Sequence, residues 1–458
     1  MPTISKNAPY DPSNRESLEN YASKLVDKTL GEALESVGRR DYTHHGGKGA
    51  FGQILEGGYF MIGTNSAPVP DFEELGIELK VAPMKRTRKK SYRSKERMVI
   101  GVIDYEKMLL EGFERTVLNK ANDMLVVFYL DDGESDVMDK KILGYKFWKF
   151  SDNDLKVLKN DWNILAKKVE NGRAHEISGG DTWYLEAAPK GSKAGSEMRK
   201  QPYSPILAQQ RAFSLKSRYV QSMWGDLNSA ESLFNGSVSF NESAPFEERI
   251  LSRFKQYEGR EYEDLRVMFG LPYSPNDKAR FARLAKGILG IDEKRDVEEF
   301  EKAGIKMKTM RLEPNGTPKE SMSFPYFKFE DLLSEVSWNE SEFHNTIDVK
   351  FLFVIFQITT DGGLYFRTAK FWNMPSEDLN TAGGEWDLAR SRISSGELEN
   401  ILKSSEGHVI HVRPHAANKG DTYIGSDGKS YEKKCFWIDQ KYLKQIAKKL
   451  CDDNDKSG

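Results

Sequence analysis

The sequence is poor in cysteine, in long hydrophobic runs and in net charge. Its 458 residues include only two cysteines, Cys435 and Cys451, which excludes a disulfide framework and a four-cysteine zinc site. The longest apolar runs, at 124–130 and 351–356, have the length of strands rather than of membrane-spanning helices. The first residues lack the charged-then-apolar pattern of a secretion signal. We therefore expect a soluble, cytoplasmic protein with no membrane partner.

The composition supports folded domains and gives one local hint of function. Hydrophobic residues make up 38% and aromatic residues 11% of the chain, which is enough to build cores. The net charge of -2 gives no global sign of a polyanionic partner. Positive charge is nevertheless clustered, because residues 85–97 hold eight basic side chains and one acidic one, and residues 187–218 hold seven and one. Such stretches are compatible with a site that tracks phosphates, and solvated loops are the alternative.

The two halves of the chain contain matching segments in the same order. They are FEELGIELKV from Phe72 and FEKAGIKMKT from Phe300, MLVVF from Met124 and LFVIF from Leu352, KFW at 146–148 and 370–372, and RAFSLKSRYV from Arg211 and KCFWIDQKYL from Lys434. Four matches in one order indicate a fold that is present twice. We predict an α/β protein with two tandem domains, each a mixed sheet flanked by helices. The domains would span 1–225 and 246–458, joined by a Ser-, Asn- and Gly-rich linker at 226–245.

Local patterns predict the elements of the first half. Apolar spacing predicts a helix over 13–36, where Ser13 and Glu16 have capping-box spacing. A short helix is expected over 48–60, after a glycine-rich turn. Strands are expected over 76–82, 98–103, 124–130 and 142–150.

The sharpest chemical pattern is Asp71 followed by Glu78-Leu-Lys80. On a strand, Glu78 and Lys80 point to one face, and Asp71 in the preceding turn can fold back to the same place. This is the Asp…Glu-x-Lys arrangement of metal-dependent nucleases. Two carboxylates can bind Mg²⁺, and the lysine can orient the attacking water and stabilise developing charge. The alternative is an edge strand with a salt-bridged face.

Other residues around this pattern could complete a site. Glu56, on the preceding short helix, offers a third carboxylate, and Lys120 before the strand at 124–130 could reach the scissile phosphate. A solvated glutamate and a surface lysine are the alternatives. Lys48 and Gly49 begin the Glu56 helix, where backbone N–H groups suit an anion or a base edge.

Several segments resemble a known family. KGAFGQILE at 48–56, DFEELGIELK at 71–80 and Lys120 before a hydrophobic strand resemble the MutH family of GATC-specific endonucleases, within the PD-(D/E)xK nuclease superfamily. The runs at 92–107, 201–220 and 318–333 resemble its two-domain type II restriction members of the Sau-three-A class. The resemblance covers nearly the whole chain.

The resemblance implies a role for each matching residue. Glu56, Asp71 and Glu78 would be ligands of Mg²⁺, Lys80 would orient the water, and Lys120 would be an accessory catalytic lysine. Lys48 and Gly49 would contact DNA, and the loop with Pro189 and Lys190 would reach base edges of GATC in the major groove. Ser214 stands where MutH has a recognition tyrosine, which leaves the role of residue 214 open.

The second copy has different residues at the catalytic positions. Glu56 becomes Lys286, Glu78 becomes Lys306, Asp71 becomes Glu299, Lys80 stays as Lys308, and Lys120 falls near Asp348. Lysines in two carboxylate positions would repel Mg²⁺, so this copy should be catalytically inactive.

The second copy keeps a loop at 411–418 that resembles the base-reading loop of MutH. In it, Arg413 could donate to a guanine, beside Pro414 and His415. We expect His411 and His415 to face DNA or solvent. The functional interpretation is a lobe that binds a second GATC site as an effector, and the alternative is a half that only completes the fold.

The sequence therefore predicts a type II restriction endonuclease that cleaves double-stranded DNA at GATC with Mg²⁺. We expect two chains to meet on the DNA, and a cognate methyltransferase to protect the host. A mismatch-repair nicking enzyme of the MutH type and a non-catalytic GATC-binding regulator are the alternatives.

Overall fold

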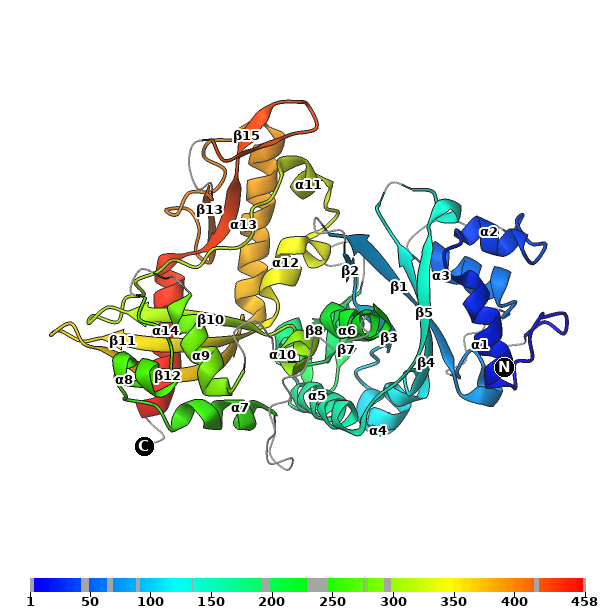
Figure 1. Ribbon diagram of the computed structural model, residues 1–458, viewed down its shortest axis with the longest axis horizontal. Coiled ribbons are helices and arrows are strands. Elements are labelled where there is room, and N and C mark those ends of the chain that lie inside the picture. The colour runs from blue at the N-terminus through cyan, green and yellow to red at the C-terminus, as the bar shows by residue number, and fades with distance from the viewer. Residues whose placement is uncertain are drawn as a thin grey trace. The chain divides into compact units, whose positions relative to one another are not determined.

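The computed structural model describes residues 4–42, 49–63, 69–87, 91–133, 135–190, 198–228, 246–274, 277, 279–291, 298–415 and 420–455. The chain divides into two compact units. Unit 1 comprises residues 1–177, 181–233 and 301–304, and unit 2 comprises 178–180, 234–300 and 305–458. Helices flank several sheets, so the prediction of a mixed α/β protein is confirmed (Figure 1).

The main sheet of unit 1 has the strand order β2-β1-β4-β5. β1 runs parallel to β4, and β5 is antiparallel to β4. Every residue of β4 from Met124 to Tyr129 is buried, as expected for a central strand covered on both faces. A second sheet has the order β3-β9-β6, and β7 and β8 form a hairpin. The strands are β1 (Glu78–Arg86), β2 (Tyr92–Ser94), β3 (Met98–Val102), β4 (Asp123–Leu130), β5 (Ile142–Lys149), β6 (Leu185–Pro189), β7 (Met198–Gln201), β8 (Ser204–Gln209) and β9 (Arg211–Leu215).

Short helices near the N-terminus cover one face of this sheet. The helix predicted over 13–36 is wrong as one element, because the chain turns through Asp27 at a positive φ of 67°. Asn14, rather than Ser13, caps the first helix by accepting from the Ser17 N–H. Thr29 forms a capping box at the start of the second helix. The helices are α1 (Arg15–Ala22), α2 (Leu30–Glu35), α3 (Ala50–Ile54), α4 (Met108–Thr116), α5 (Asp152–Glu170) and α6 (Ser217–Asn228).

Unit 2 contains a sheet of order β10-β11-β12. β10 runs parallel to β11, and β12 is antiparallel to β11. β13 pairs with β16, and β14 with β15. The strands are β10 (Lys306–Leu312), β11 (Lys350–Ile358), β12 (Leu364–Asn373), β13 (Ile410–Pro414), β14 (Thr422–Ile424), β15 (Ser430–Glu432) and β16 (Lys434–Ile438). The helices are α7 (Phe246–Lys255), α8 (Tyr262–Met268), α9 (Arg280–Leu289), α11 (Phe329–Ser334), α12 (Glu342–Ile347), α13 (Ser376–Ser394) and α14 (Gln440–Asp455), and α10 (Glu298–Ala303) spans the division between the units.

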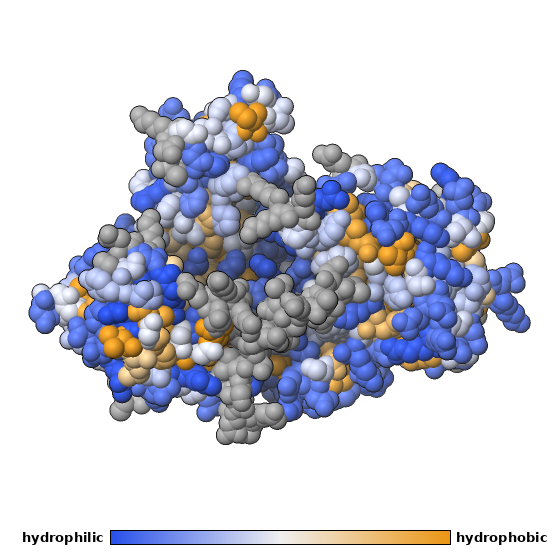
Figure 2. Space-filling model, in the orientation of Figure 1, coloured by the Kyte–Doolittle hydropathy of each residue, from blue (hydrophilic) through white to orange (hydrophobic). Residues whose placement is uncertain are grey.

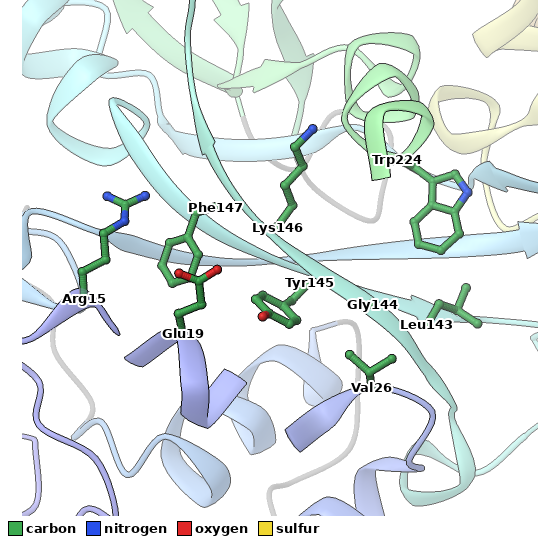
Figure 3. A pocket seen from close by; sticks show the side chains of 9 residues that line it. All are labelled: Arg15, Glu19, Val26, Leu143, Gly144, Tyr145, Lys146, Phe147 and Trp224. Carbon is green, nitrogen blue, oxygen red and sulfur yellow. The ribbon is translucent and has the colours of Figure 1, made fainter. Parts of the chain in front are cut away.

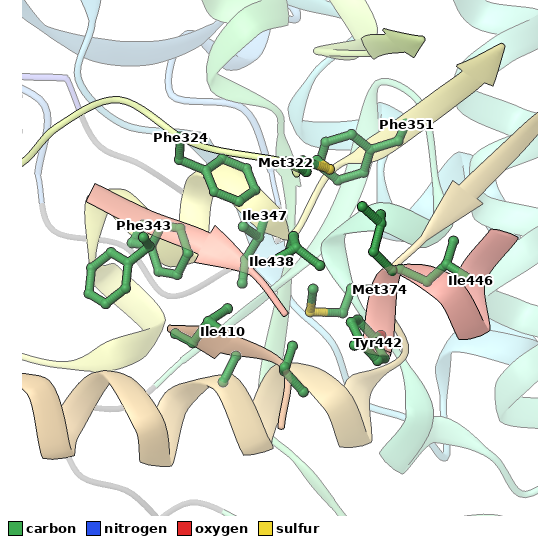
Figure 4. Close-up of a cluster of buried hydrophobic side chains, with 14 of the residues drawn as sticks. Met322, Phe324, Phe343, Ile347, Phe351, Met374, Ile410, Ile438, Tyr442 and Ile446 are labelled. Carbon is green, nitrogen blue, oxygen red and sulfur yellow. The ribbon is translucent and has the colours of Figure 1, made fainter. Parts of the chain in front are cut away.

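The two faces of the β10-β11-β12 sheet carry separate cores. α7, α8 and α9 pack on one face against Leu352, Val354 and Phe356. The other face, with Phe351 and Phe353, joins a larger cluster that includes α13, β13 and β16. Figure 4 shows this cluster around the long helix α13. Because apolar side chains cover β11 on both sides, its sequence is a continuous hydrophobic run.

The registers of the two main sheets correct one of the sequence matches. Met124 pairs with Glu78 and with Trp148, whereas the corresponding place in unit 2 is taken by Phe351, which pairs with Lys306 and Trp372. The match of MLVVF with LFVIF from Leu352 is therefore wrong by one residue. A strand buried on both faces has no polar alternation to set its register, and only the pairing with its neighbours decides it.

The residues coloured in Figure 2 form no extended apolar face in this view. Hydrophilic residues cover most of the visible face of each unit, and the hydrophobic patches between them are small. Among the described residues, no helix has both the length and the hydropathy that a membrane span requires.

Candidate active site

Glu56 lies in a wide helical turn that is packed tightly against β1. α3 begins after Gly49, whose φ of 93° favours glycine, and it continues into a π-helical turn at Leu55–Tyr59. The Phe51 ring stacks on Tyr129 of β4 with centroids 3.7 Å apart. A Cβ at Gly52 would lie 3.2 Å from the Val81 side chain, so the absence of a side chain lets α3 approach β1. Such π-helical turns are frequent at functional sites.

The Asp71, Glu78 and Lys80 side chains meet at the start of β1. Asp71 folds back, as predicted, and its Oδ2 accepts the backbone N–H of Leu79 at 2.9 Å. Lys80 Nζ donates to Glu78 Oε1 at 2.8 Å, and Glu78 is 6% exposed. The second carboxylate oxygen of Glu78, Oε2, is buried and has no hydrogen-bond partner among the described residues. A buried carboxylate oxygen without a donor is an electrostatic cost that a cation would relieve.

Electrostatic interactions connect these residues with Glu56 and Lys120. Burial, then the charges of Asp71 and Glu78, raise the pKa of Glu56 to about 7. Burial and Glu78 likewise raise the pKa of Asp71 to about 6. The ammonium groups of Lys80 and Lys120 oppose both shifts. Mutual repulsion of carboxylates is the usual condition of a site that holds a divalent cation.

The donor chemistry of this cluster suits a hard cation. Three carboxylates supply the oxygen ligands that Mg²⁺ prefers. In the described part of the chain, no three His, Cys, Asp or Glu side chains stand close enough together to hold a metal as they are. Glu56, Asp71 and Glu78 nevertheless interact electrostatically, because the charges of Asp71 and Glu78 raise the pKa of Glu56.

Lys120 ends a 3-10 turn, Leu118–Lys120, directly before β4. Because β4 runs parallel to β1, its N-terminal end lies beside the start of β1, where Glu78 pairs with Met124. The turn therefore brings the half-buried Lys120 to the same end of the sheet as Glu78.

The predicted DNA-contacting residues that the structure describes in unit 1 lie at the start of α3 and at the end of β6. Gly49 is exposed, and Lys48 lies outside the described residues. Pro189 ends β6 opposite Arg211, and the Lys190 N–H donates to Gln210 O at 2.8 Å. Residues 191–197 of the same loop also lie outside the described part.

The corresponding loop of unit 2 is exposed at the end of β13. Arg413, Pro414 and His415 are all exposed, and the Arg413 guanidinium lies 6.0 Å from the centroid of the Trp437 ring. Residues 416–419 lie outside the described part. The expectation for His411 is wrong, because its side chain is buried at 2% exposure. The neighbouring Ile410 is buried as well, so both faces of β13 are covered at its start, and only its end is exposed.

The basic stretch at 85–97 is partly neutralised. Lys95 pairs with Asp131 at 2.9 Å, and Arg97 lies 3.4 Å from Glu186. Residues 88–90 lie outside the described part. Two of the predicted phosphate-tracking cations are therefore held by carboxylates of unit 1.

The sequence analysis missed two buried carboxylates that hold the β6 and β13 strands. Asp161 of α5, fully buried, accepts the N–H groups of Trp183, Tyr184 and Leu185 at 2.7–2.9 Å. Burial raises its pKa to about 6, against the effect of these donors. In unit 2, Glu385 of α13 accepts the N–H groups of residues 408–410 in the same way. An acidic residue within an apolar helix stripe, as in Leu158-x-x-Asp161-x-x-x-Leu165, was the available signal.

A pocket on unit 1 contains none of the predicted site residues. It has a volume of about 660 Å³ and lies between α1, β5 and Trp224. Figure 3 shows Arg15 and Glu19 of α1 facing Phe147 of β5. The Arg15 guanidinium lies 4.7 Å from the Phe147 ring centroid and pairs with Asp123 at 2.9 Å. Since β5 and β1 are separated by β4 in the sheet, this pocket is distinct from the Glu78 cluster.

Comparison with known proteins identifies relatives of the chain. The family model of the DNA mismatch repair enzyme MutH matches residues 60–161, which include Asp71, Glu78, Lys80 and Lys120. The type II restriction enzyme Sau3AI of Staphylococcus aureus is 33% identical over 470 residues, covering 92% of this chain and 94% of that protein.

Shorter relatives match about half of the chain. The mismatch repair proteins MutH of Shewanella woodyi and Vibrio campbellii are 26% and 25% identical over 224 and 225 residues. These matches cover 47% and 46% of this chain and 93% and 94% of the two relatives. Because the similarity to Sau3AI extends over nearly both full lengths, the chain belongs to the MutH-like family of type II restriction enzymes that includes Sau3AI, and it is a site-specific deoxyribonuclease.

Proposed function

We propose that unit 1 cleaves double-stranded DNA at GATC by Mg²⁺-dependent phosphodiester hydrolysis. The observation that carries the proposal is the cluster of Glu56, Asp71, Glu78 and Lys80 at the start of β1. The extended similarity to a type II restriction enzyme supports hydrolysis of DNA. The GATC sequence is carried over from the family resemblance.

Each residue of the cluster takes a separate role in this mechanism. Glu56, Asp71 and Glu78 would hold the cation, which supplies charge stabilisation at the phosphoryl group and makes the attacking water more acidic. Lys80, held against Glu78, would orient that water and donate to a non-bridging phosphate oxygen. Lys120 would add positive charge beside the scissile phosphate. The backbone N–H groups near Gly49, together with Pro189 and Lys190, would position the DNA and contact base edges.

In this proposal, unit 2 is an inactive copy of the same PD-(D/E)xK fold. The predicted domains at 1–225 and 246–458, with a linker at 226–245, would be the two tandem copies. Lys286 and Lys306 replace two metal-binding carboxylates, so unit 2 would not hold Mg²⁺. The exposed Arg413, Pro414 and His415 would bind a second GATC site, and its occupancy would stimulate cleavage by unit 1.

One catalytic centre per chain requires two chains, or two successive nicks, to cut both strands. We therefore propose that two chains meet on the DNA and that a cognate methyltransferase protects host sites.

The proposal is tested with plasmids that carry zero, one or several GATC sites, incubated with the purified protein and Mg²⁺. We expect cleavage of the GATC plasmids alone, faster on those with several sites, and four-base 5′ overhangs when the fragment ends are sequenced. Asp71→Ala should abolish cleavage and preserve binding. Binding without cleavage by the wild type in Mg²⁺ or Mn²⁺ would indicate a regulator instead. Nicks in one strand only would indicate a repair-type enzyme.

A further inference from the structure

The sheet registers show which residues of unit 2 stand at the catalytic positions of unit 1. In unit 1, Lys80 pairs with Val126, which pairs with Lys146. In unit 2, Lys308 pairs with Phe353, which pairs with Lys370. Lys146 and Lys370 are the first residues of the two KFW segments. Lys308 therefore occupies the place of Lys80, and Lys306, two residues earlier on the same face of β10, occupies the place of Glu78.

An aromatic contact gives the same equivalence for the preceding helix. Phe51 of α3 stacks on Tyr129 of β4, and Phe281 of α9 lies 4.9 Å from Phe356 of β11. Tyr129 and Phe356 lie at matching positions of their strands, so α3 and α9 contact their sheets in the same way. Lys286 follows Phe281 by five residues, as Glu56 follows Phe51. The positions of Glu56, Glu78 and Lys80 are thus all lysines in unit 2.

The lysines at these positions differ in how they are held. Lys306 Nζ donates to Thr346 O at 2.8 Å. Lys308 is half-buried and has neither a hydrogen bond nor a carboxylate partner among the described residues. Its ammonium lies 5.8 Å from the centroid of the Phe324 ring, and burial lowers its pKa. A partly desolvated ammonium without an anion is unfavourable, and a bound anion would stabilise it. The side chain of Glu299, aligned with Asp71, lies outside the described part.

We propose that Lys286, Lys306 and Lys308 form a binding site for one DNA backbone phosphate, at the place where unit 1 holds the phosphate that it cuts. The inference rests on the proposed function of unit 2 as a lobe that binds GATC. Lysine binds phosphate as a point charge and needs no metal for it. The same substitutions that remove the carboxylates would then create the phosphate contact. A lysine at the position of Glu56 or Glu78 supplies the positive charge that the cation would supply in unit 1.

The site predicts a specific contribution of one phosphate to binding. We would titrate the full-length chain with a GATC duplex in EDTA, which prevents cleavage, and count the duplexes bound. The wild type should bind two. The double variant Lys306→Gln/Lys308→Gln should bind the second duplex about tenfold more weakly, with a salt dependence reduced by about the equivalent of one phosphate contact. Lys444→Gln/Lys448→Gln, two exposed lysines of α14 in the same unit, is the charge-matched control and should bind as the wild type does.

A scan of neutral phosphates identifies the contact. Duplexes with a single methylphosphonate at each phosphate around GATC would be bound to the wild type and to both double variants. At one position, the neutral linkage should weaken the second binding event about tenfold in the wild type and the control, and add nothing in Lys306→Gln/Lys308→Gln. The conservative variant Lys306→Arg/Lys308→Arg should restore the sensitivity, which separates charge from folding.

The outcomes separate the inference from the proposed function. If the wild type binds two duplexes and the Lys306→Gln/Lys308→Gln variant binds both with the wild-type affinities, the phosphate site is overturned and the second GATC lobe stands. Methylphosphonate effects that are the same in the wild type and in that variant also overturn it. A wild type that binds a single duplex overturns the second GATC lobe, and the phosphate site with it.

Discussion

The two main sheets of this protein share their framework and differ in their chemistry. In both units a strand with charged residues pairs in parallel with a buried strand, which pairs antiparallel with a strand that carries the KFW segment. In both, a carboxylate on a 19-residue helix accepts three backbone N–H groups at the start of a neighbouring strand. The residues at the start of the first strand, however, are Glu78 and Lys80 in unit 1 and Lys306 and Lys308 in unit 2. The charge therefore reverses where Lys306 stands in the place of Glu78. The two cores can accommodate this change because these side chains lie at the end of the sheet.

The largest expected effect tests whether matching lysines have different roles. Lys80→Gln should slow single-turnover cleavage of a GATC duplex about a thousandfold, because in the proposed mechanism Lys80 contacts the reacting atoms. Lys308→Gln should slow cleavage about threefold at low DNA concentration, less than the effect of the double variant, because Lys306 would still contact the proposed phosphate of unit 2. Equal losses would mean that the two lysines do not differ in role.

A smaller effect tests whether the frameworks are equivalent. Phe51→Ala and Phe281→Ala should each lower the free energy of unfolding of their own unit by about 3 kcal/mol, because each leaves a cavity beside a central strand. Denaturation monitored separately for each unit by hydrogen exchange measures this. A loss in one unit only would show that α3 and α9 do not support their sheets in the same way.

The buried carboxylates give a more local comparison. Asp161→Ala should destabilise the start of β6 by about 2 kcal/mol, since three backbone N–H groups lose their acceptor. Amide exchange should accelerate at 183–185 and stay unchanged at 408–410. Glu385→Ala should give the reverse pattern. Acceleration at both segments in either variant would contradict two independent contacts.

The smallest effect concerns pH and metal binding. The pKa values of about 7 for Glu56 and about 6 for Asp71 mean that both carboxyls lose protons between pH 5 and 8. A cation binds the deprotonated forms, so the affinity for Mg²⁺ should rise about tenfold from pH 6 to pH 8. Calorimetric titration measures this, and Glu78→Gln, which removes a proposed ligand and should weaken binding at every pH, is the control. An affinity that is independent of pH would contradict the assignment of Glu56 and Asp71 as ligands.

Some expectations from the sequence failed for reasons that are local. The helix predicted over 13–36 is broken at Asp27, and a positive φ there cannot be deduced from the apolar spacing on either side. The match between the buried strands was off by one residue, because β4 and β11 are apolar on both faces. His411 was placed on the surface, although both faces of β13 are covered at its start, where Ile410 and His411 are buried.

The sequence by itself determined the α/β class, the buried strands and the candidate cluster. It could do so because the strands are continuous apolar runs, and because Asp71, Glu78 and Lys80 lie within ten residues of one another. Only the tertiary structure decided the register of the buried strand β11 against β10, which corrects the alignment of the two buried strands. It also decided the burial that leaves Glu78 Oε2 without a hydrogen-bond partner among the described residues and places the Lys308 ammonium over the Phe324 ring. Strand pairing and desolvation depend on segments far apart in the chain, and no local pattern records which of them meet.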